Sequence, residues 1–241
     1  MISVAYSLFF WTFLTVTSIA FSAVAVLLRL ATGPFDPRLK ILHRFTSWWG
    51  SLYIWSNPFW KVSIEGEMPP DRPYVMVANH LSTVDIGLLF CLPLYYKWVS
   101  KAENFRVPFI GWSMSLNRYI KIRRGTVSST LRMMRDCDRA LREGNSVMIF
   151  PEGTRSRDGK LRPFKDGAFE LAVRHRVPVL PIVINGSMRA LPRRGFVLGR
   201  GCRITVRVLE PLEPSTFEGL TASELRNRVR AIFEGWIGEE R

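Results

Sequence analysis

A histidine and an aspartate five positions apart could form an acid–base pair in this chain. His80 follows an apolar run at residues 75–78, and Asp85 comes five residues later. In a regular helix five residues turn through about 500°, which would leave the two side chains roughly 140° apart. The S-x-x-D pattern from Ser82 to Asp85 predicts a helix that begins at Ser82, with His80 in the preceding loop, so that the two side chains can meet.

Two roles fit this pair. In the functional role, Asp85 fixes the imidazole tautomer, and the other ring nitrogen of His80 takes a proton from a substrate hydroxyl. In the structural role, Asp85 only caps the helix, and His80 is a histidine satisfied within the fold. The segment by itself leaves both roles open.

A second candidate site is the loop F-P-E-G-T-R-S at residues 150–156. It leaves a hydrophobic strand, where α/β sheets bind ligands. Arg155 suits a phosphate ester because guanidinium pairs bidentately with phosphate oxygens, and Gly153 permits close approach of the backbone. The alternative is a solvated basic turn. The G-x-x-x-x-G-K-[ST] and G-x-G-x-x-G phosphate loops are absent from the chain.

The elements that must position these residues alternate between β-branched runs and helical patterns, which predicts an α/β fold. Strands are predicted at residues 62–65, 74–78, 98–100, 119–122, 147–150, 179–184 and 203–209.

Two helices are predicted outside the candidate site. Residues 126–143 form one, with Leu131, Met134 and Leu141 on its buried face and Gly144 at its C-terminal cap. The second begins at Thr221, where T-x-x-E is a capping box. Its apolar stripe predicts packing rather than a cofactor site and consists of Leu225, Val229, Ile232, Phe233 and Trp236.

The N-terminus predicts a membrane helix. Residues 1–28 contain no Asp, Glu, Lys or Arg, and as a helix they would be roughly 40 Å long, enough to cross a hydrocarbon core of about 30 Å. A cleavable signal peptide is the alternative, but no basic residue precedes the apolar run. The basic residues that follow, at positions 29–44, predict a catalytic body on the cytoplasmic face of the cytoplasmic membrane.

A second apolar stretch, at residues 45–60, is rich in tryptophan and tyrosine. Such rings settle at the headgroup level of a bilayer, although an ordinary core helix fits the stretch as well. We therefore divide the chain into membrane-anchoring helices at 1–60 and a catalytic domain at 61–241.

Composition limits the partners. The 241 residues are 47% hydrophobic, which excludes a disordered chain. The net charge of +14 fits an anionic leaflet rather than nucleic acid, since the chain has no zinc finger, basic recognition helix or aromatic RNA-binding motif. The three cysteines, Cys91, Cys137 and Cys202, lie too far apart in sequence to imply a zinc site or a disulfide framework.

Taken together, the motifs resemble those of the 1-acylglycerol-3-phosphate acyltransferase family of glycerolipid synthesis. The match consists of N-H-x-x-x-x-D at 79–85, K-x-x-x-x-x-x-P-x-x-G at 101–111, Y-I-K-I-R-R-G at 119–125, F-P-E-G-T-R-S at 150–156 and V-P-V-L-P-I-V at 177–183. Arg123 stands where the family commonly has Asp, so the family's arginine is either Arg123 or Arg124.

The resemblance implies an α/β fold with a mixed β-sheet flanked by helices, preceded by the N-terminal membrane helices. It also implies acyl transfer from acyl-CoA or acyl carrier protein, as co-substrate, to a lysophospholipid acceptor, with no resident cofactor or metal. His80 is then the general base and Asp85 its orienting partner. Substrate binding falls to Asn79, Lys101, Arg123, Arg124, Glu152, Gly153, Thr154 and Arg155. The acceptor could also be a lyso-ornithine lipid or glycerol 3-phosphate. A non-catalytic membrane-anchored lipid-binding protein is the alternative from another class.

Overall fold

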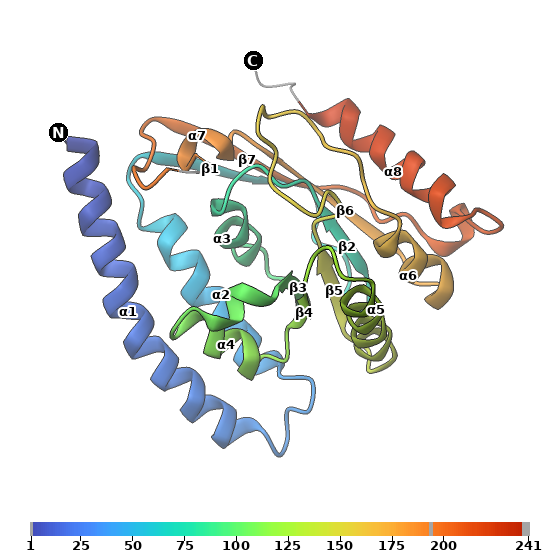
Figure 1. Ribbon diagram of the computed structural model, residues 1–241, viewed down its shortest axis with the longest axis horizontal. Helices are drawn as coiled ribbons and strands as arrows, with labels where there is room; N and C mark the ends of the chain where they lie inside the picture. The colour runs from blue at the N-terminus through green and yellow to red at the C-terminus, as the bar shows by residue number, and fades with distance from the viewer. Residues whose placement is uncertain (1, 193–194, 238–241) are drawn as a thin grey trace.

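The β-branched runs of the sequence form a single seven-stranded sheet in the computed structural model, which describes residues 2–192 and 195–237 (Figure 1). The strands are β1 (Trp60–Glu65), β2 (Val75–Ala78), β3 (Tyr96–Lys101), β4 (Ile120–Ile122), β5 (Ser146–Ile149), β6 (Val179–Asn185) and β7 (Cys202–Val208). Their order is β1-β7-β6-β2-β5-β3-β4, with β6 and β7 antiparallel and the other neighbours parallel. The mixed sheet and all seven predicted strands are confirmed.

Helices cover both faces of the sheet (Figure 1). They are α1 (Ile2–Thr32), α2 (Lys40–Trp55), α3 (Val84–Phe90), α4 (Ile110–Leu116), α5 (Val127–Arg142), α6 (Gly167–His175), α7 (Ser187–Ala190) and α8 (Ala222–Trp236), with short 3-10 turns at Ala102–Arg106 and Pro214–Thr216. The core on one face includes residues of α2 and α3, and the core on the other includes residues of α5, α6 and α8.

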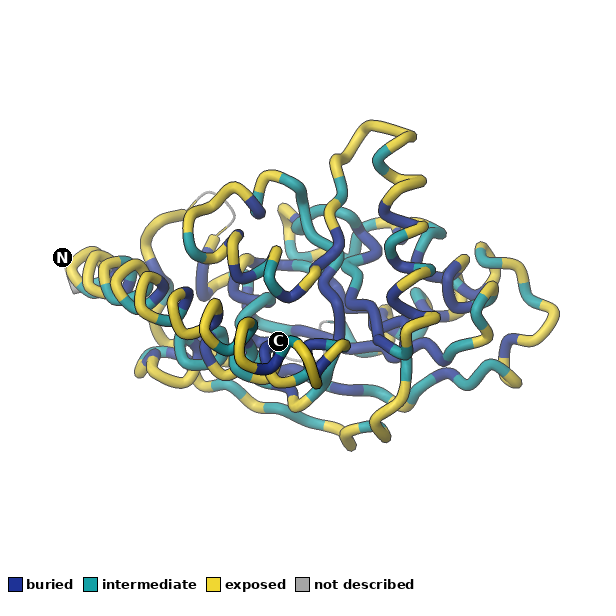
Figure 2. The backbone as a smooth tube through the Cα atoms, turned by 90° about the horizontal axis from the view of Figure 1, so that it is seen from below, coloured by how far each residue is buried: buried dark blue, intermediate teal, exposed yellow. Residues whose placement is uncertain are grey.

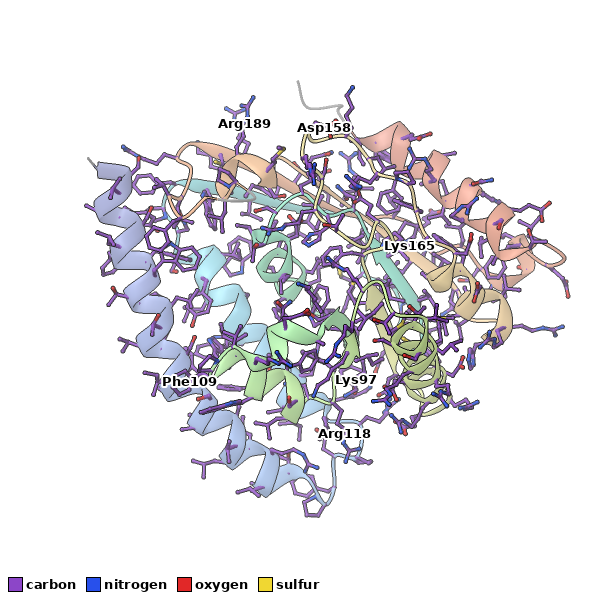
Figure 3. All side chains as sticks on the ribbon, viewed as in Figure 1. Lys97, Phe109, Arg118, Asp158, Lys165 and Arg189 are labelled. Carbon is purple, nitrogen blue, oxygen red and sulfur yellow. The ribbon has the colours of Figure 1, made fainter. Side chains whose placement is uncertain are left out.

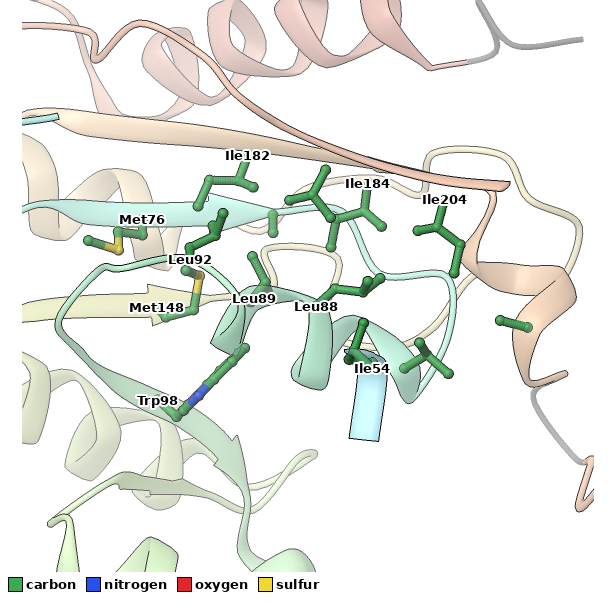
Figure 4. Packing of buried hydrophobic residues seen from close by; sticks show 14 of the residues in the cluster. Ile54, Met76, Leu88, Leu89, Leu92, Trp98, Met148, Ile182, Ile184 and Ile204 are labelled. Carbon is green, nitrogen blue, oxygen red and sulfur yellow. The ribbon is translucent and has the colours of Figure 1, made fainter. Parts of the chain in front are cut away.

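Strand β2 has apolar side chains on both faces of the sheet, so helices must cover both faces. Met76 and Ala78 belong to one core and Val75 and Val77 to the other, as expected when successive side chains of a strand point to opposite faces. Figure 4 shows Met76 and its neighbours on the sheet facing the leucines of α3. Because all four residues of β2 are buried, its carboxyl end is a rigid platform for the loop that follows.

Helix α1 is long, apolar and poorly covered. Among the described residues, Ser3–Thr32 is the helix long and apolar enough to cross a membrane. Figure 2 shows exposed residues along the whole length of this helix, and Leu27 and Leu30 are 65% and 72% exposed. Its first half nevertheless contacts the body, because Trp11 Nε1 donates to the Phe196 carbonyl at 2.8 Å.

Helix α2, which contains most of the aromatic stretch, has both a face packed in the core and an exposed aromatic face. Trp49 and Ile54 are buried against the body, whereas Trp48 and Trp55 are more than half exposed. Ile54 shares a core with Trp60 of β1, so packing is continuous across residue 60.

Two local predictions were wrong. Helix α3 begins at Val84 rather than Ser82, because Ser82 lies before the helix as a capping residue whose hydroxyl accepts from the Val84 amide at 3.3 Å. The same hydroxyl donates to the Leu191 carbonyl at 2.7 Å. Leu131 of α5 is 57% exposed, and the buried face runs instead through Met133, Met134, Cys137, Ala140 and Leu141. The predicted capping box at Thr221 and Glu224 is present.

Candidate active site

His80 and Asp85 meet as the sequence predicts. The loop after β2 places His80 Nδ1 2.9 Å from Asp85 Oδ2, and the Asp85 side chain is fully buried. The same carboxylate oxygen accepts hydrogen bonds from the Leu81 and Ser82 amides at 2.7 and 2.8 Å. With Nδ1 donating to Asp85, Nε2 is the nitrogen that can accept a proton.

The second oxygen of Asp85 is held by a residue that the sequence did not indicate. Ser187, the first residue of α7, donates its hydroxyl to Asp85 Oδ1. The preceding Gly186 has a φ of +79°, and a Cβ there would lie 2.0 Å from the Arg203 carbonyl oxygen. Only glycine allows this turn, which brings Ser187 from the end of β6 to the buried carboxylate. Asp85 therefore has donors on both oxygens.

Glu152 fixes the loop on the other side of His80. One carboxylate oxygen accepts from the His80 amide at 2.6 Å, and the other accepts from the Arg162 amide at 2.8 Å. Burial raises the pKa of Glu152 to about 7, against the lowering effect of these two amides. This carboxylate joins the His80 loop to the loop after β5. Its contacts therefore indicate a positioning role for Glu152 rather than direct substrate binding.

The imidazole of His80 forms part of the wall of an apolar cavity. Its ring stacks on Phe150 with centroids 3.9 Å apart, and Phe150 contacts the ring of Trp98. The cavity has a volume of about 530 Å³, and its apolar lining comes mainly from α1, α2, α3, α4 and β5. It combines a mainly apolar lining with His80 at the wall, which suits a substrate with a hydrocarbon chain and a reactive polar end.

Cationic side chains lie on the polar part of this cavity. Lys101, Arg124 and Lys165 are among its lining residues. Arg155 donates to the Thr83 hydroxyl at 2.7 Å, and Thr83 precedes α3 and lines the cavity as well. A negatively charged headgroup near His80 would thus meet several positive charges.

The remaining predicted binding residues are divided between this cavity and other parts of the protein. Asn79 is fully buried, and its amide group exchanges two hydrogen bonds with the backbone of Ile184, so it ties β2 to β6 rather than binding substrate. Arg123 lines a different cavity, whereas Arg124 lines the one that contains His80. Of the two arginines left open by the sequence, Arg124 is the one near the histidine. Gly153 lines the cavity, and Thr154 follows it in the turn before Arg155.

This arrangement of histidine, buried aspartate and apolar cavity coincides with a family match. A family model described as acyltransferase matches residues 60–185, more than half of the chain. The chain belongs to the acyltransferase family. The matched region contains His80, Asp85 and Arg155, so the family and the geometry identify the same loops.

Curated relatives of this acyltransferase-family chain carry one activity in their names. A chloroplastic 1-acyl-sn-glycerol-3-phosphate acyltransferase from Brassica napus is 36% identical over 217 residues, which is 86% of this chain and 62% of the relative. One from Chlamydomonas reinhardtii is 42% identical over 161 residues, or 66% of this chain and 48% of the relative. The chain thus spans about half to three fifths of the length of these two relatives.

The fold has a close structural counterpart. The crystal structure of the 1-acyl-sn-glycerophosphate acyltransferase from Thermotoga maritima matches with a TM-score of 0.80, covering 98% of this chain and 95% of that chain at 24% identity. The acyltransferase fold predicted from the motifs is therefore confirmed.

Two residues of the candidate site, Ser187 and Lys165, were not predicted from the sequence. Ser187 follows Asn-Gly at a strand exit, a turn signal that points to a placed side chain but not to its partner. Lys165 packs against Gly153, where a Cβ would lie 3.1 Å from Lys165 Cε. Lys165 comes ten residues after Arg155, and nothing in its local pattern marks it.

The backbone amides of the His80 loop are not available to an oxyanion. The amides of His80, Leu81 and Ser82 donate to Glu152 and Asp85. The Gly153 amide donates to the Phe150 carbonyl. Lys165 is therefore the better candidate to stabilise negative charge beside the loop after β5.

Proposed function

We propose that the chain transfers a fatty acyl group from a thioester donor to the free hydroxyl of 1-acylglycerol 3-phosphate, giving phosphatidic acid. The observation that carries the proposal is the His80–Asp85 pair, 2.9 Å apart and facing an apolar cavity of about 530 Å³. The names of the relatives from Brassica napus and Chlamydomonas reinhardtii support the same acceptor.

His80 acts as the general base of this reaction. Its Nε2 removes the proton from the acceptor hydroxyl as the oxygen attacks the thioester carbonyl carbon. Asp85 holds the tautomer and stabilises the imidazolium that forms, as its buried carboxylate is locked by four donors. The C–O bond forms, the C–S bond breaks, and the proton on His80 passes to the leaving thiolate.

Arg155, assisted by Lys165 and Arg124, binds the phosphate of the acceptor. A guanidinium binds phosphate oxygens bidentately, and Arg155 is held by Thr83, three residues after His80. The phosphate is thereby fixed close to the histidine while the acyl chains occupy the apolar cavity. The donor is a co-substrate, acyl-CoA or acyl carrier protein, and the reaction uses no resident cofactor or metal.

The membrane is the source of the acceptor in this proposal. Removing a lysophospholipid chain from the bilayer costs about 0.8 kcal/mol for every CH₂ exposed to water, so an enzyme on the leaflet saves that cost. Ser7 and Trp11 contact residues 196–198 of the body, so the first half of α1 lies along the protein. In this proposal the exposed apolar face of α1 enters the leaflet from which the acceptor comes. The basic residues 29–44 favour the cytoplasmic leaflet.

An acceptor panel tests the proposed function. The purified full chain is assayed with acyl-CoA and acyl carrier protein donors against 1-acylglycerol 3-phosphate, a lyso-ornithine lipid and glycerol 3-phosphate. The proposal predicts the highest kcat/KM for 1-acylglycerol 3-phosphate. A higher value for either other acceptor would replace the substrate assignment, and no transfer to any acceptor would favour a lipid-binding protein.

A further inference from the structure

A second cavity lies beside the active-site cavity and is larger. Its volume is about 840 Å³, and its lining comes from the α1–α2 loop, the β3 and β4 strands and α5. Strand β4 is the last in the sheet order, so one of its edges is open toward this region. Neither His80 nor Asp85 lines this cavity, and the mechanism described above makes no use of it.

The lining of this second cavity is strongly basic. It includes Arg38, Lys97, Arg118, Lys121, Arg123 and Arg132. The carboxylates in the lining are Asp136 and Glu143, and Asp136 is already ion-paired with Arg139 at 2.6 Å. The cavity therefore carries a large excess of positive charge, which favours a ligand with several negative charges.

One buried basic group shows that this charge is built into the fold. Lys97 is 4% exposed, and its ammonium donates to the backbone carbonyls of Arg38 and Asn117. Burial, reinforced by the charge of Arg118, lowers the pKa of Lys97 to about 8. Figure 3 shows Lys97 and Arg118 near each other at the lower end of the molecule. A fold that places like charges together beside a cavity gains when an anion binds there.

The size of the cavity selects the kind of anion. Pockets of about 300–1,000 Å³ hold cofactor-sized molecules, whereas protein partners dock on broad surfaces of about 800 Å². Arginine matches the planar geometry of phosphate oxygens. A small molecule with more than one phosphate group fits both the volume and the lining.

The linings of the two cavities come together along β4 and the turn between β4 and α5. Tyr119 lines both. Arg123 lines the basic cavity and the next residue, Arg124, lines the apolar one, while Ser129 and Thr130 of α5 divide in the same way. A single extended ligand can therefore have phosphates in the basic cavity and a hydrocarbon chain near His80.

We propose that the basic cavity binds the phosphorylated nucleotide of a coenzyme A thioester, so that this chain uses acyl-CoA as its donor. The inference rests on the proposed acyl transfer and deepens it, by naming the donor and the place of its phosphates. The pantetheine arm passes the β4–α5 turn and presents the thioester to His80. Arg118, Lys121 and Arg132 bind the phosphates, and none of them takes part in the chemical step.

The test measures binding of adenosine 3′,5′-bisphosphate to the full chain in detergent by calorimetry. Arg132→Glu removes one lining charge, and Lys121→Glu, at an exposed position on β4, is a second variant. Arg135→Glu is the matched control, because Arg135 is also exposed on α5 but does not line the cavity. We expect both lining variants to weaken binding by about tenfold or more. They should raise the KM for acyl-CoA similarly, with the acceptor KM unchanged, and the control should leave both unchanged.

Three results would overturn the proposal. They are no binding of the bisphosphate, equal losses in the lining variants and the control, and binding of phosphatidylglycerol vesicles in place of the nucleotide. The last would assign the cavity to a lipid headgroup. Repeating the titration with His80→Ala separates the two proposals, since that variant should lose turnover and keep nucleotide binding.

Discussion

Single side chains around Asp85 determine how firmly the histidine is held. The Ser187 hydroxyl donates to Asp85 Oδ1, on the side opposite His80. Ser187→Ala would leave a buried carboxylate oxygen without that donor, at a cost of about 1–3 kcal/mol in the free energy of unfolding. We expect kcat to fall about tenfold and the acceptor KM to stay near that of the parent chain, because the serine positions the base and does not touch substrate.

The control is Ser223→Ala, which removes a serine that donates to Asp166 at the protein surface. Urea denaturation and steady-state kinetics of both variants are the measurement. Equal kcat values for Ser187→Ala and the control would show that Asp85 needs no support from α7.

Arg155 is a second single side chain whose role can be tested, in acceptor binding rather than in positioning the base. Arg155→Ala removes the guanidinium held by Thr83 and, with it, the proposed contact to the acceptor phosphate. A charge-assisted hydrogen bond of about 1.5–3 kcal/mol corresponds to a rise in acceptor KM of about 10- to 100-fold. The KM of the thioester donor should stay unchanged. An unchanged acceptor KM would exclude Arg155 from the acceptor site, and Arg157→Ala, exposed in the same loop, is the control.

The motifs predicted which residues meet but not what surrounds them. His80 and Asp85 could be paired from sequence because a loop followed by a helix start brings positions five apart together. Asn79 and Glu152 were assigned to substrate binding because they belong to motifs that resemble those of the acyltransferase family. Their partners, the backbones of Ile184, His80 and Arg162, belong to distant segments, so sequence spacing could not reveal that these polar groups are satisfied inside the protein.

At the scale of elements, Glu152 joins the loop after β2 to the loop after β5. Its pKa is raised from 4.5 to about 7 by burial, so between these values the folded chain binds a proton that the unfolded chain has released. The free energy of unfolding therefore falls as the pH rises from about 4.5 to about 7, by as much as about 3 kcal/mol from this group.

Glu152→Gln removes this titration. The parent chain and the variant are denatured with urea in detergent at several pH values, with Glu170→Gln, exposed on α6, as the control. The free energy of unfolding of the parent minus that of Glu152→Gln should decrease as the pH rises from 4.5 to 7. The free energy of unfolding of the parent minus that of Glu170→Gln should not change across this range. A difference that stays constant across this pH range would show that Glu152 titrates alike in the folded and unfolded chains.

Elements were easier to predict than their ends. The seven strands could be recognised because apolar β-branched runs between turns have few alternatives in a chain of this composition. The start of α3 was misplaced because the S-x-x-D pattern marks the residues that cap a helix, and the capping Ser82 lies before the first helical residue. Leu131 was misassigned because an exposed leucine on α5 fits the helical period as well as a buried one does.

At the scale of the whole molecule, the exposed face of α1 is the surface on which membrane binding depends. Leu27 and Leu30 are largely exposed, so replacing both with lysine should leave the fold intact. Each substitution removes a leucine side chain that would be inserted in the lipid and places a charge there instead. The double variant should therefore bind vesicles at least tenfold more weakly.

The double variant should also lose activity on vesicle-embedded acceptor more than on acceptor dispersed in detergent. Vesicle flotation and the two assays are the measurements, with Leu131→Lys on α5 as the control. Equal flotation of the Leu27→Lys/Leu30→Lys variant and the parent would remove α1 from the membrane contact.

The whole-molecule arrangement was the least predictable level. Apolar length indicated a membrane helix at residues 1–28, but the contacts of Ser7 and Trp11 with residues 196–198 depend on the fold of the body. The basic cavity was likewise hidden, because its basic residues come from α5, from β4 and from loops that lie far apart in the sequence.

The central claim is that His80 and Asp85 act as one general-base unit. The most direct test compares initial rates of acyl transfer for His80→Ala, Asp85→Ala and the double variant. His175→Ala is the control, since it disrupts a second His–Asp pair, with Asp138, away from the cavity.

We predict that each active-site variant loses at least about a thousandfold in kcat and that the double variant is no worse than the worse single one, because groups acting as a unit are not additive. His175→Ala should retain kcat near that of the parent chain. Substantial activity in folded His80→Ala, or losses that multiply in the double variant, would contradict the account.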